Sequence, residues 1–206
     1  MAPYRYAISA TLLICVLILS YHLIRLIRLG APRDFSRQAG DLKSAIVYSF
    51  VGAMSPFKKE SAYLHLPTYL AGLCYHAGSF TSIVLFFLFF FEITFEGVLH
   101  TVVAGFLLLS AFSGAGILLK RITQKKLRSL SNPDDYISNS LVTMFQFSTF
   151  GMLIDGTFAP VYSLCVCLLL LYIPIGKLKH MLYFFAARYH LGLFYGWRGI
   201  WPGGRG

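Results

Sequence analysis

Five long runs of apolar residues, separated by short polar segments, constrain the fold of this chain more than any other feature. The runs cover about 7–29, 60–91, 98–119, 136–154 and 158–178. About 20 apolar residues are enough for a helix to cross a bilayer. The 206 residues are 57% hydrophobic and 13% charged, which is more apolar surface than a soluble domain of this size can bury. We predict an all-α polytopic membrane protein, a bundle of five transmembrane helices in a single membrane domain.

The positions of the basic residues predict the orientation of this bundle. Seven lie between Arg25 and Lys59, five within 120–128 and five from Lys177 onward, whereas the N-terminal segment has only Arg5. Because basic loops stay on the cytoplasmic side, we expect the N-terminus outside and the C-terminus in the cytoplasm. Residues 179–206 then form a cytoplasmic interfacial tail. The net charge of +10 lies between apolar runs, so we predict membrane lipid as a partner and no nucleic acid.

Local signals predict where several elements begin. Asn132 can cap a helix, Pro133 suits its first position, and the two aspartates that follow complement the positive end of the helix dipole. The fourth helix should therefore begin there, at the cytoplasmic face. Ser55-Pro56 similarly predicts the start of the second helix. Residues 41–54 are too short to span and should lie along the membrane surface.

The cysteines indicate neither a disulfide framework nor a metal site. All four lie in apolar segments without CxxC or zinc-ligand spacing, and no CxxCH motif for haem attachment is present: Cys15, Cys74, Cys165 and Cys167. We interpret them as buried structural thiols. Any haem in this chain would be held non-covalently.

Two histidines of the second apolar run are the first candidates for a cofactor site. His65 and His76 are eleven residues apart, which places them on one helix face about 16 Å apart along its axis. An ionisable residue inside a span is a functional hypothesis, although one histidine can simply bond to a neighbouring helix. Paired imidazoles on one face favour haem ligation, because haem iron takes axial histidines from facing helices.

His180 is the expected partner of His65, because both lie at the cytoplasmic boundary of their helices. The partner of His76 stays open. Tyr162 lies five turns before His180 and could ligate or hydrogen-bond, His100 lies near the outer end of the third helix, and Met152 has a depth comparable to that of His76.

Other residues have simpler interpretations. We expect His22 to hydrogen-bond and His190 to belong to an interfacial segment that docks a partner. Glycines lie beside His76 and along the third helix, where they would admit either a flat macrocycle or, more commonly, a closely packed helix: Gly72, Gly78, Gly105, Gly114 and Gly116.

The whole pattern resembles a known family. The matching features are the pair His65 and His76, the segment GILLKRI, the opening DDYISNSLV of the fourth helix, and IPIGKLKHMLYFFAARY. They resemble the gamma subunit of respiratory nitrate reductase and the related cytochrome b subunits of heterodisulfide-reductase-type and sulfite-reduction-associated complexes. The resemblance covers most of 60–190. The segments MSPFKKESAYLHLPTY and FYGWRGIWPGG are more similar to the heterodisulfide-reductase-like members.

The resemblance implies a ligand set. In the family, two b-type haems are stacked across the membrane, each held by one histidine of the second helix and one of the fifth. His65 and His180 would hold the cytoplasmic haem b, and His76 would hold an outer one. The chain departs from the family where the second histidine of the fifth helix is expected, because Tyr162 stands there. The expectation is one haem b, with a second if His76 finds a ligand.

The resemblance also implies a role. The chain would be the electron-transfer subunit of an oxidoreductase in the inner membrane of a prokaryote, between menaquinone or ubiquinone and an iron–sulfur or cytochrome partner subunit. It would have no catalytic residue of its own and would complete no reaction alone. One alternative is a haem-free membrane anchor whose histidines are structural. A small transporter fits less well, because no acidic residue lies deep in a span.

Overall fold

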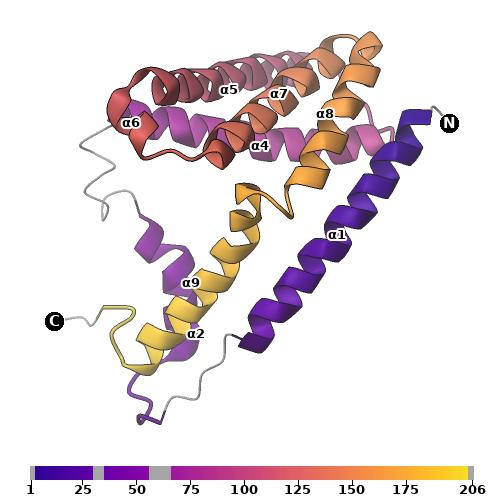
Figure 1. Cartoon of the computed structure of the whole chain (residues 1–206). Helices are drawn as coiled ribbons and strands as arrows, with labels where there is room; N and C mark the ends of the chain where they lie inside the picture. Colours follow the sequence, from indigo (N-terminus) through magenta and orange to yellow (C-terminus); the bar gives the residue numbers. More distant parts are fainter. Residues whose placement is uncertain (1–2, 30–34, 56–65, 204–206) are drawn as a thin grey trace. The chain divides into compact units, whose positions relative to one another are not determined.

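Every regular element in the described part of the chain is helical. The structure, a computed structural model, describes residues 3–29, 35–55 and 66–203. Its elements are α1 (Pro3–Leu29), α2 (Leu42–Phe50), η1 (Gly52–Met54), α4 (Leu66–Phe90), α5 (Val98–Thr123), α6 (Lys125–Ser129), α7 (Pro133–Ile154), η3 (Gly156–Phe158), α8 (Ala159–Tyr172), η4 (Lys177–Lys179) and α9 (His180–Trp197) (Figure 1). The all-α prediction is confirmed for these residues.

The chain divides into two compact units, where the sequence predicts a single membrane domain. Unit 1 contains Met1–Val16 and Leu66–Leu178, and unit 2 contains Leu17–His65 and Lys179–Gly206. Within the described ranges, α1, α4, α5 and α7 are each long and apolar enough to cross a membrane. A fifth span exists if Gly156–Tyr172 and Lys177–Trp197 together form one broken span. The structure therefore supports a multi-pass membrane protein with four or five apolar spans.

The fifth predicted run is not one continuous helix. We expected a span over 158–178, but α8 ends at Tyr172 and is about 21 Å long, which is shorter than the hydrocarbon core of a bilayer. The reason is Pro174, which has no backbone N–H to continue the helix. The backbone N–H of Gly176 turns back to the carbonyl oxygen of Tyr172 at 2.8 Å. The predicted boundary at Ser55-Pro56 and the first residues of the second span lie partly outside the described residues, and α4 begins at Leu66.

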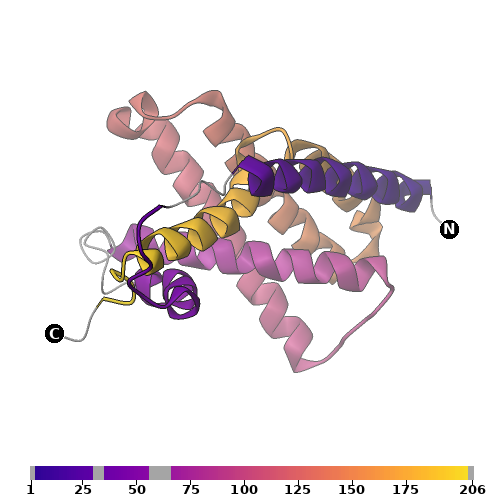
Figure 2. The ribbon, with the colours of Figure 1, turned by 90° about the horizontal axis from the view of Figure 1, so that it is seen from below.

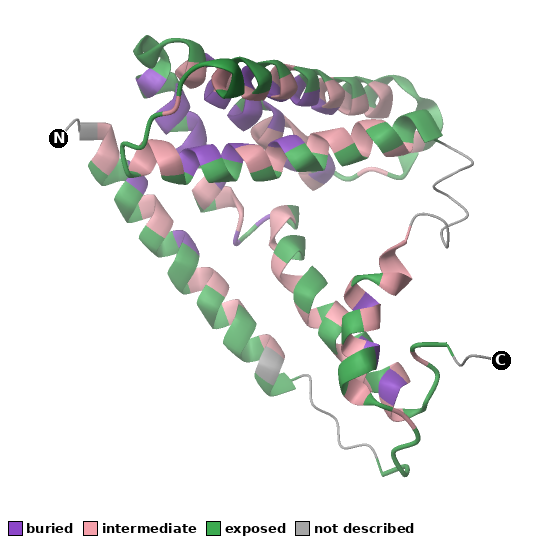
Figure 3. Cartoon of the chain, turned by 180° about the vertical axis from the view of Figure 1, so that it is seen from behind, coloured by how far each residue is buried: buried purple, intermediate pink, exposed green. Residues whose placement is uncertain are grey.

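Unit 1 is a bundle in which α4, α5 and α7 lie side by side and α8 packs against α7 (Figure 1, Figure 2). Its apolar core joins α4, α7 and α8 with the first half of α1: Ile8, Phe86, Phe145, Tyr162, Val166 and Leu169. The outward faces of these helices carry exposed apolar side chains, and buried residues lie on the faces turned toward each other (Figure 3). Apolar side chains on the outside suit contact with lipid tails.

The predicted start of the fourth helix is confirmed. Asn132 caps α7 by accepting a hydrogen bond from the backbone N–H of Asp135 at 3.0 Å, and the Asp135 carboxylate accepts one from the Asn132 N–H. This reciprocal capping box, with Pro133 at the first helical position, satisfies N–H groups that a helix start otherwise leaves unpaired. At the other end of α7, Asp155 accepts from the Thr157 N–H at 2.9 Å, and hydrogen bonds from Thr157 lower the pKa of Asp155.

Unit 2 is built on the pair of α2 and α9. Asp41 caps α2 by accepting from the Ser44 N–H at 2.9 Å, and the hydrogen bonds from Ser44 lower the pKa of Asp41. The segment 41–54, expected to be too short to span, forms α2 followed by η1. The segment before α2 also contacts the end of α9, because the Trp197 indole N–H donates to the Ser36 carbonyl at 2.9 Å.

Two glycines spaced four residues apart allow α9 to approach α2 at backbone distance. A methyl group at Gly192 would lie 2.6 Å from Ile46 Cα, and one at Gly196 would lie 2.5 Å from Ala45 Cβ. On α2 the facing residues are also small, since Ala45 and Ser49 are fully buried. The Ser49 hydroxyl is 2.7 Å from the Arg188 carbonyl oxygen. This is the small-residue packing by which helices associate without large side chains.

Replacing Gly192 with alanine should destabilise unit 2. The added methyl group meets backbone rather than a flexible side chain, so the helices must separate, at a cost of about 1–3 kcal/mol. The measurement is thermal unfolding of the purified protein in detergent, followed by circular dichroism. Gly105→Ala is the matched control, because a methyl group there meets nothing described within 4 Å. It should be neutral or slightly stabilising, and equal melting temperatures for the two variants would contradict the prediction.

Candidate functional site

His76 lies on an open face of α4. Its side chain is exposed, and so are Phe80 and Ile83 one and two turns further on. Gly72, one turn before His76, has no described heavy atom within 4 Å of the position of a side-chain Cβ. The Tyr75 ring lies 6.1 Å from the imidazole, between centroids. The imidazole and the space over Gly72 therefore lie on one exposed stripe of a candidate span.

The expected pair of His65 and His180 cannot be assembled from the described residues, because His65 lies outside them. His180 is the first residue of α9, and its side chain is exposed. His22 on α1 is half-buried beside the Tyr21 ring, and His190 on α9 is half-buried beside the Tyr189 ring. The structure thus places His180, His22 and His190 in unit 2 and His76 in unit 1.

The three candidates for the ligand opposite His76 all lie in unit 1. Tyr162 is 4% exposed, and its ring packs on Phe89 of α4 and Phe145 of α7, with centroids 5.8 and 6.2 Å away. Phe89 is thirteen residues after His76, about 20 Å along the helix axis. Met152 packs half-buried against the same core cluster. The structure therefore groups Tyr162 and Met152 around the far end of α4 from His76.

His100 has a structural use. Its Nε2 lies 2.9 Å from the Leu153 carbonyl oxygen, so the imidazole joins the start of α5 to the end of α7. Leu153 is in the last turn of α7, where carbonyl groups have no partner within the helix. This contact is the interhelical hydrogen bond that we weighed as the simpler role of a membrane histidine.

A buried polar seam, which the sequence interpretation missed, joins α4, α5 and α7. Gln146 of α7 is fully buried and donates through Nε2 to the Tyr75 carbonyl oxygen at 3.0 Å and to Ser79 Oγ at 2.9 Å. Its Oε1 lies 2.9 Å from the Ser110 hydroxyl of α5. Both amide hydrogens and the amide oxygen are therefore satisfied, as a buried amide requires.

The seam extends two turns from Gln146 toward the start of α7. The Tyr75 hydroxyl donates to the Asn139 carbonyl oxygen at 3.1 Å. The Thr143 hydroxyl lies 3.0 Å from Asn139 Oδ1 and 3.3 Å from the Tyr75 hydroxyl. Glycines make room for these contacts, because a Cβ at Gly78 would lie 1.9 Å from Ser110 Oγ, and one at Gly114 would lie 2.4 Å from the Tyr75 ring. These two glycines therefore allow α4 and α5 to pack closely.

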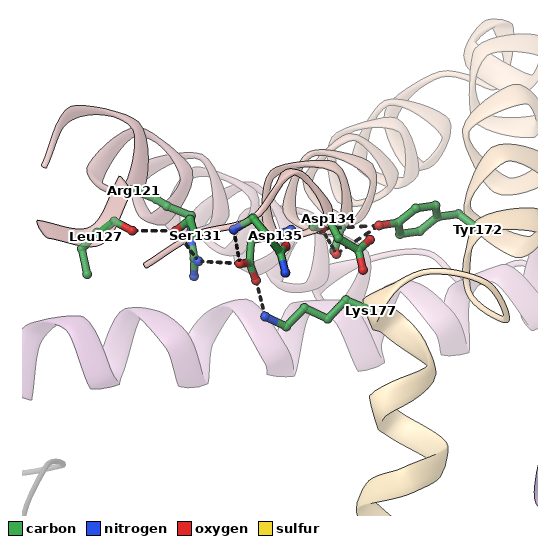
Figure 4. A network of polar contacts seen from close by, with 9 residues as sticks. Arg121, Leu127, Ser131, Asp134, Asp135, Tyr172 and Lys177 are labelled. Carbon is green, nitrogen blue, oxygen red and sulfur yellow. Dashed lines mark hydrogen bonds and ion pairs between the residues drawn. The ribbon is translucent and has the colours of Figure 1, made fainter. Parts of the chain in front are cut away.

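A charge cluster lies beside the start of α7, at one end of the seam (Figure 4). The carboxylate of Asp135 is 7% exposed and forms ion pairs with Lys177 and with Arg121 of α5, the latter at 3.6 Å. The Arg121 guanidinium also donates to the Ser131 hydroxyl at 3.0 Å. Beside this cluster, the Tyr172 hydroxyl lies 3.4 Å from the Asp134 carbonyl oxygen. The cluster ties α5, α7 and the chain after α8 together at one end of unit 1.

Periodicity within α7 was the available signal for this seam. Asp135, Asn139, Thr143, Gln146 and Thr149 recur every three or four residues, which places them on one face. Among the four helices that could span by themselves, α7 has the lowest mean hydropathy. Hydropathy averaged over α7 is still high enough to predict a span, so the average does not reveal that one face of the helix is polar.

The cysteines agree only in part with their interpretation as buried structural thiols. All four are free; Cys15 and Cys165 are buried, whereas Cys74 and Cys167 are half-buried. In the ranges that the structure describes, no three His, Cys, Asp or Glu side chains gather to hold a metal ion. Haem needs two axial side chains at most, so this finding does not bear on haem.

Comparison with known proteins adds no relative. No protein-family model, curated protein or solved structure matches the chain.

Replacing Asp135 with asparagine should weaken the charge cluster. The amide keeps the size of the side chain but loses the ion pairs with Lys177 and Arg121, at a cost of about 1–2 kcal/mol. Thermal unfolding in detergent at low ionic strength measures the effect. Asp134→Asn is the matched control, because it removes the neighbouring first-turn charge without touching either ion pair. Equal destabilisation by the two variants would mean that the helix dipole, and not the cluster, is the cause.

Proposed function

We propose that this protein is a haem b membrane subunit of a respiratory oxidoreductase complex. It would transfer electrons between the quinone pool and a partner iron–sulfur or cytochrome subunit, as the resemblance to the nitrate reductase gamma subunit-like cytochromes b implies. The observation that carries the proposal is the open stripe of α4, where the exposed imidazole of His76 lies one turn from Gly72.

The residues on this stripe suit a flat macrocycle. His76 would hold a haem through a neutral imidazole nitrogen. The missing side chain at Gly72 would leave room for the cofactor on the same stripe. Phe80 and Ile83 on the same stripe offer an apolar surface, which helps to tune a haem by excluding water.

A second ligand pair rests on the family resemblance. His65 and His180 would hold a haem at the cytoplasmic end, and His76 would hold the outer one, with its sixth ligand left to Tyr162, His100 or Met152. Of these three, His100 already contacts the Leu153 carbonyl, and Tyr162 and Met152 lie in the core at the far end of α4. When bound, haem b supplies reversible one-electron chemistry, and the chain's part is to hold and orient it.

The proposed setting follows from the distribution of charge. Seventeen of the eighteen basic residues lie in segments assigned to one side, so the N-terminus would be outside and residues 179–206 cytoplasmic. This orientation suits the inner membrane of a prokaryote, with menaquinone or ubiquinone diffusing in the bilayer. The partner subunit would meet the basic cytoplasmic segments, and the chain would complete no reaction alone.

One observation favours the second candidate, a haem-free membrane anchor. The contact of His100 with the Leu153 carbonyl is a structural use of a histidine in a candidate span. If His65, His76 and His180 serve in the same way, the chain holds a complex in the membrane without carrying electrons.

Absorbance of the purified, dithionite-reduced protein separates these two candidates. A b-type haem gives an alpha band, and we expect it in the wild type. His65→Ala and His180→Ala should each remove the haem that they share, because an axial ligand is lost. His76→Ala should remove the haem on the open stripe. Pyridine haemochrome then counts one haem per chain or two.

His190→Ala is the matched control, since it removes an imidazole that we assign to the interface and should leave the spectrum unchanged. A wild-type protein, purified from cells supplied with a haem precursor, that shows no alpha band would favour the haem-free anchor.

A further inference from the structure

The buried face of α7 is polar along most of its length. Asp135, Thr143, Gln146 and Thr149 are each less than 9% exposed, and half-buried Asn139 continues their spacing. From Asp135 to Thr149 the face rises about 21 Å, in a helix about 33 Å long. A polar face of this length within a candidate span is costly unless it is used.

Polar groups follow one another along this face in three separate bonded sets, from its charged end to its middle. The first group is Asp135, whose ion pair with Lys177 connects it to a half-exposed side chain (Figure 4). The next groups are the Asn139 amide, the Thr143 hydroxyl and the Tyr75 hydroxyl, spaced 3.0–3.3 Å apart. The Gln146 amide follows, with its contacts to α4 and α5.

Beyond Gln146 lie two buried hydroxyls that no described residue satisfies. Ser82 is fully buried and Tyr162 is 4% exposed, and neither hydroxyl has a hydrogen-bond partner among the residues described. Ser82 follows Ser79 by one turn on the buried side of α4. The Tyr162 ring packs on Phe145, which lies one turn before Thr149.

Helix association explains only part of this arrangement. The bonds of Gln146 and Tyr75 hold three helices together, as interhelical polar contacts do in membranes. The hydroxyls of Ser82 and Tyr162 form no such bond, and an unsatisfied buried hydroxyl costs free energy. Ordered water between such groups is the usual way in which they are satisfied.

We infer that the polar face of α7 is a proton path that enters unit 1 at the Asp135 cluster and ends at Ser82 and Tyr162, with water carrying the proton between its separate polar groups. Ionisable side chains relay protons in other membrane proteins, and buried water bridges polar groups that have no other partner. The use of these protons rests on the proposed function: a quinone that gains two electrons takes up two protons, which form the two O–H bonds of the quinol. Oxidation of the quinol releases the same two protons.

Hydrogen–deuterium exchange of the full chain in lipid nanodiscs tests the path without any electron transfer. In the wild type, segments 79–86 and 146–153 should exchange about tenfold faster than 8–16 of α1, because water reaches them. Thr149→Val removes a buried hydroxyl of the polar face that, among the described residues, bonds only the Phe145 carbonyl of its own helix. It should slow exchange at 146–153 and leave 135–142 unchanged. If the face only held helices together, Thr149→Val would change neither segment, which would overturn the proposal.

Ser82→Ala is a second test, at the inner end of the path. It removes a hydroxyl that bonds no described residue, so the melting temperature should not fall, while exchange at 146–153 slows. Ser113→Ala is the matched control, because that hydroxyl contacts the Leu109 carbonyl of its own helix at 3.0 Å, and it should change neither quantity. Exchange at 79–86 and 146–153 as slow as at 8–16 in the wild type would also overturn the path.

The outcome is separable from that of the proposed function. If no haem alpha band appeared, the electron-transfer proposal would be contradicted, whereas fast exchange at 79–86 and 146–153 would still support the proton path. A haem band with uniformly slow exchange would remove the path and leave the electron-transfer proposal standing.

Discussion

Unit 1 depends on the satisfaction of one buried amide. In hydrocarbon, a polar group without a partner costs several kcal/mol, because no water replaces the missing bond. Gln146 is fully buried at the place where α4, α5 and α7 meet, and its side chain bonds to groups on the other two helices. Sliding any of these helices by one residue would break these contacts together. The amide therefore sets the register of the bundle, because apolar contacts alone would tolerate several helix registers.

Glycine makes this register accessible, and it serves the same purpose in unit 2. At Gly78 and Gly114 a side chain would collide with Ser110 and Tyr75, so the polar seam can form only where the backbone comes this near. At Gly192 and Gly196 the backbone of α9 meets that of α2 in the same way. Because lipid tails are as apolar as leucine, close packing and hydrogen bonds, rather than hydrophobic burial, must hold helices together in a membrane. Unit 1 follows this rule, and unit 2 uses the same close glycine packing.

Hydropathy and capping rules predicted the helical character, the apolar runs and the start of α7 at Asn132, because these properties depend on neighbours in the sequence. They did not predict the interruption at Pro174, because the mean hydropathy of the run does not register the loss of one backbone N–H. The polar seam was not predicted for a similar reason. In a hydropathy average, the apolar neighbours of Gln146 outweigh it, and its role becomes clear only when its partners on α4 and α5 are known. The histidines were noticed from the sequence, yet His100 has a contact that only the fold reveals.

The two proposals concern different faces of one helix. Along α4, Gly72, His76, Phe80 and Ile83 share the open stripe, whereas Tyr75, Gly78, Ser79 and Ser82 face α5 and α7. At about 100° per residue, the buried residues centre about 100° around the helix axis from the open stripe, and Ser79 lies only about 60° from His76. A cofactor on the open stripe would therefore lie beside the edge of the proposed proton path. Electrons can tunnel through protein, whereas protons need a chain of bonded groups, so the two routes would differ in mechanism although they follow neighbouring faces of one helix.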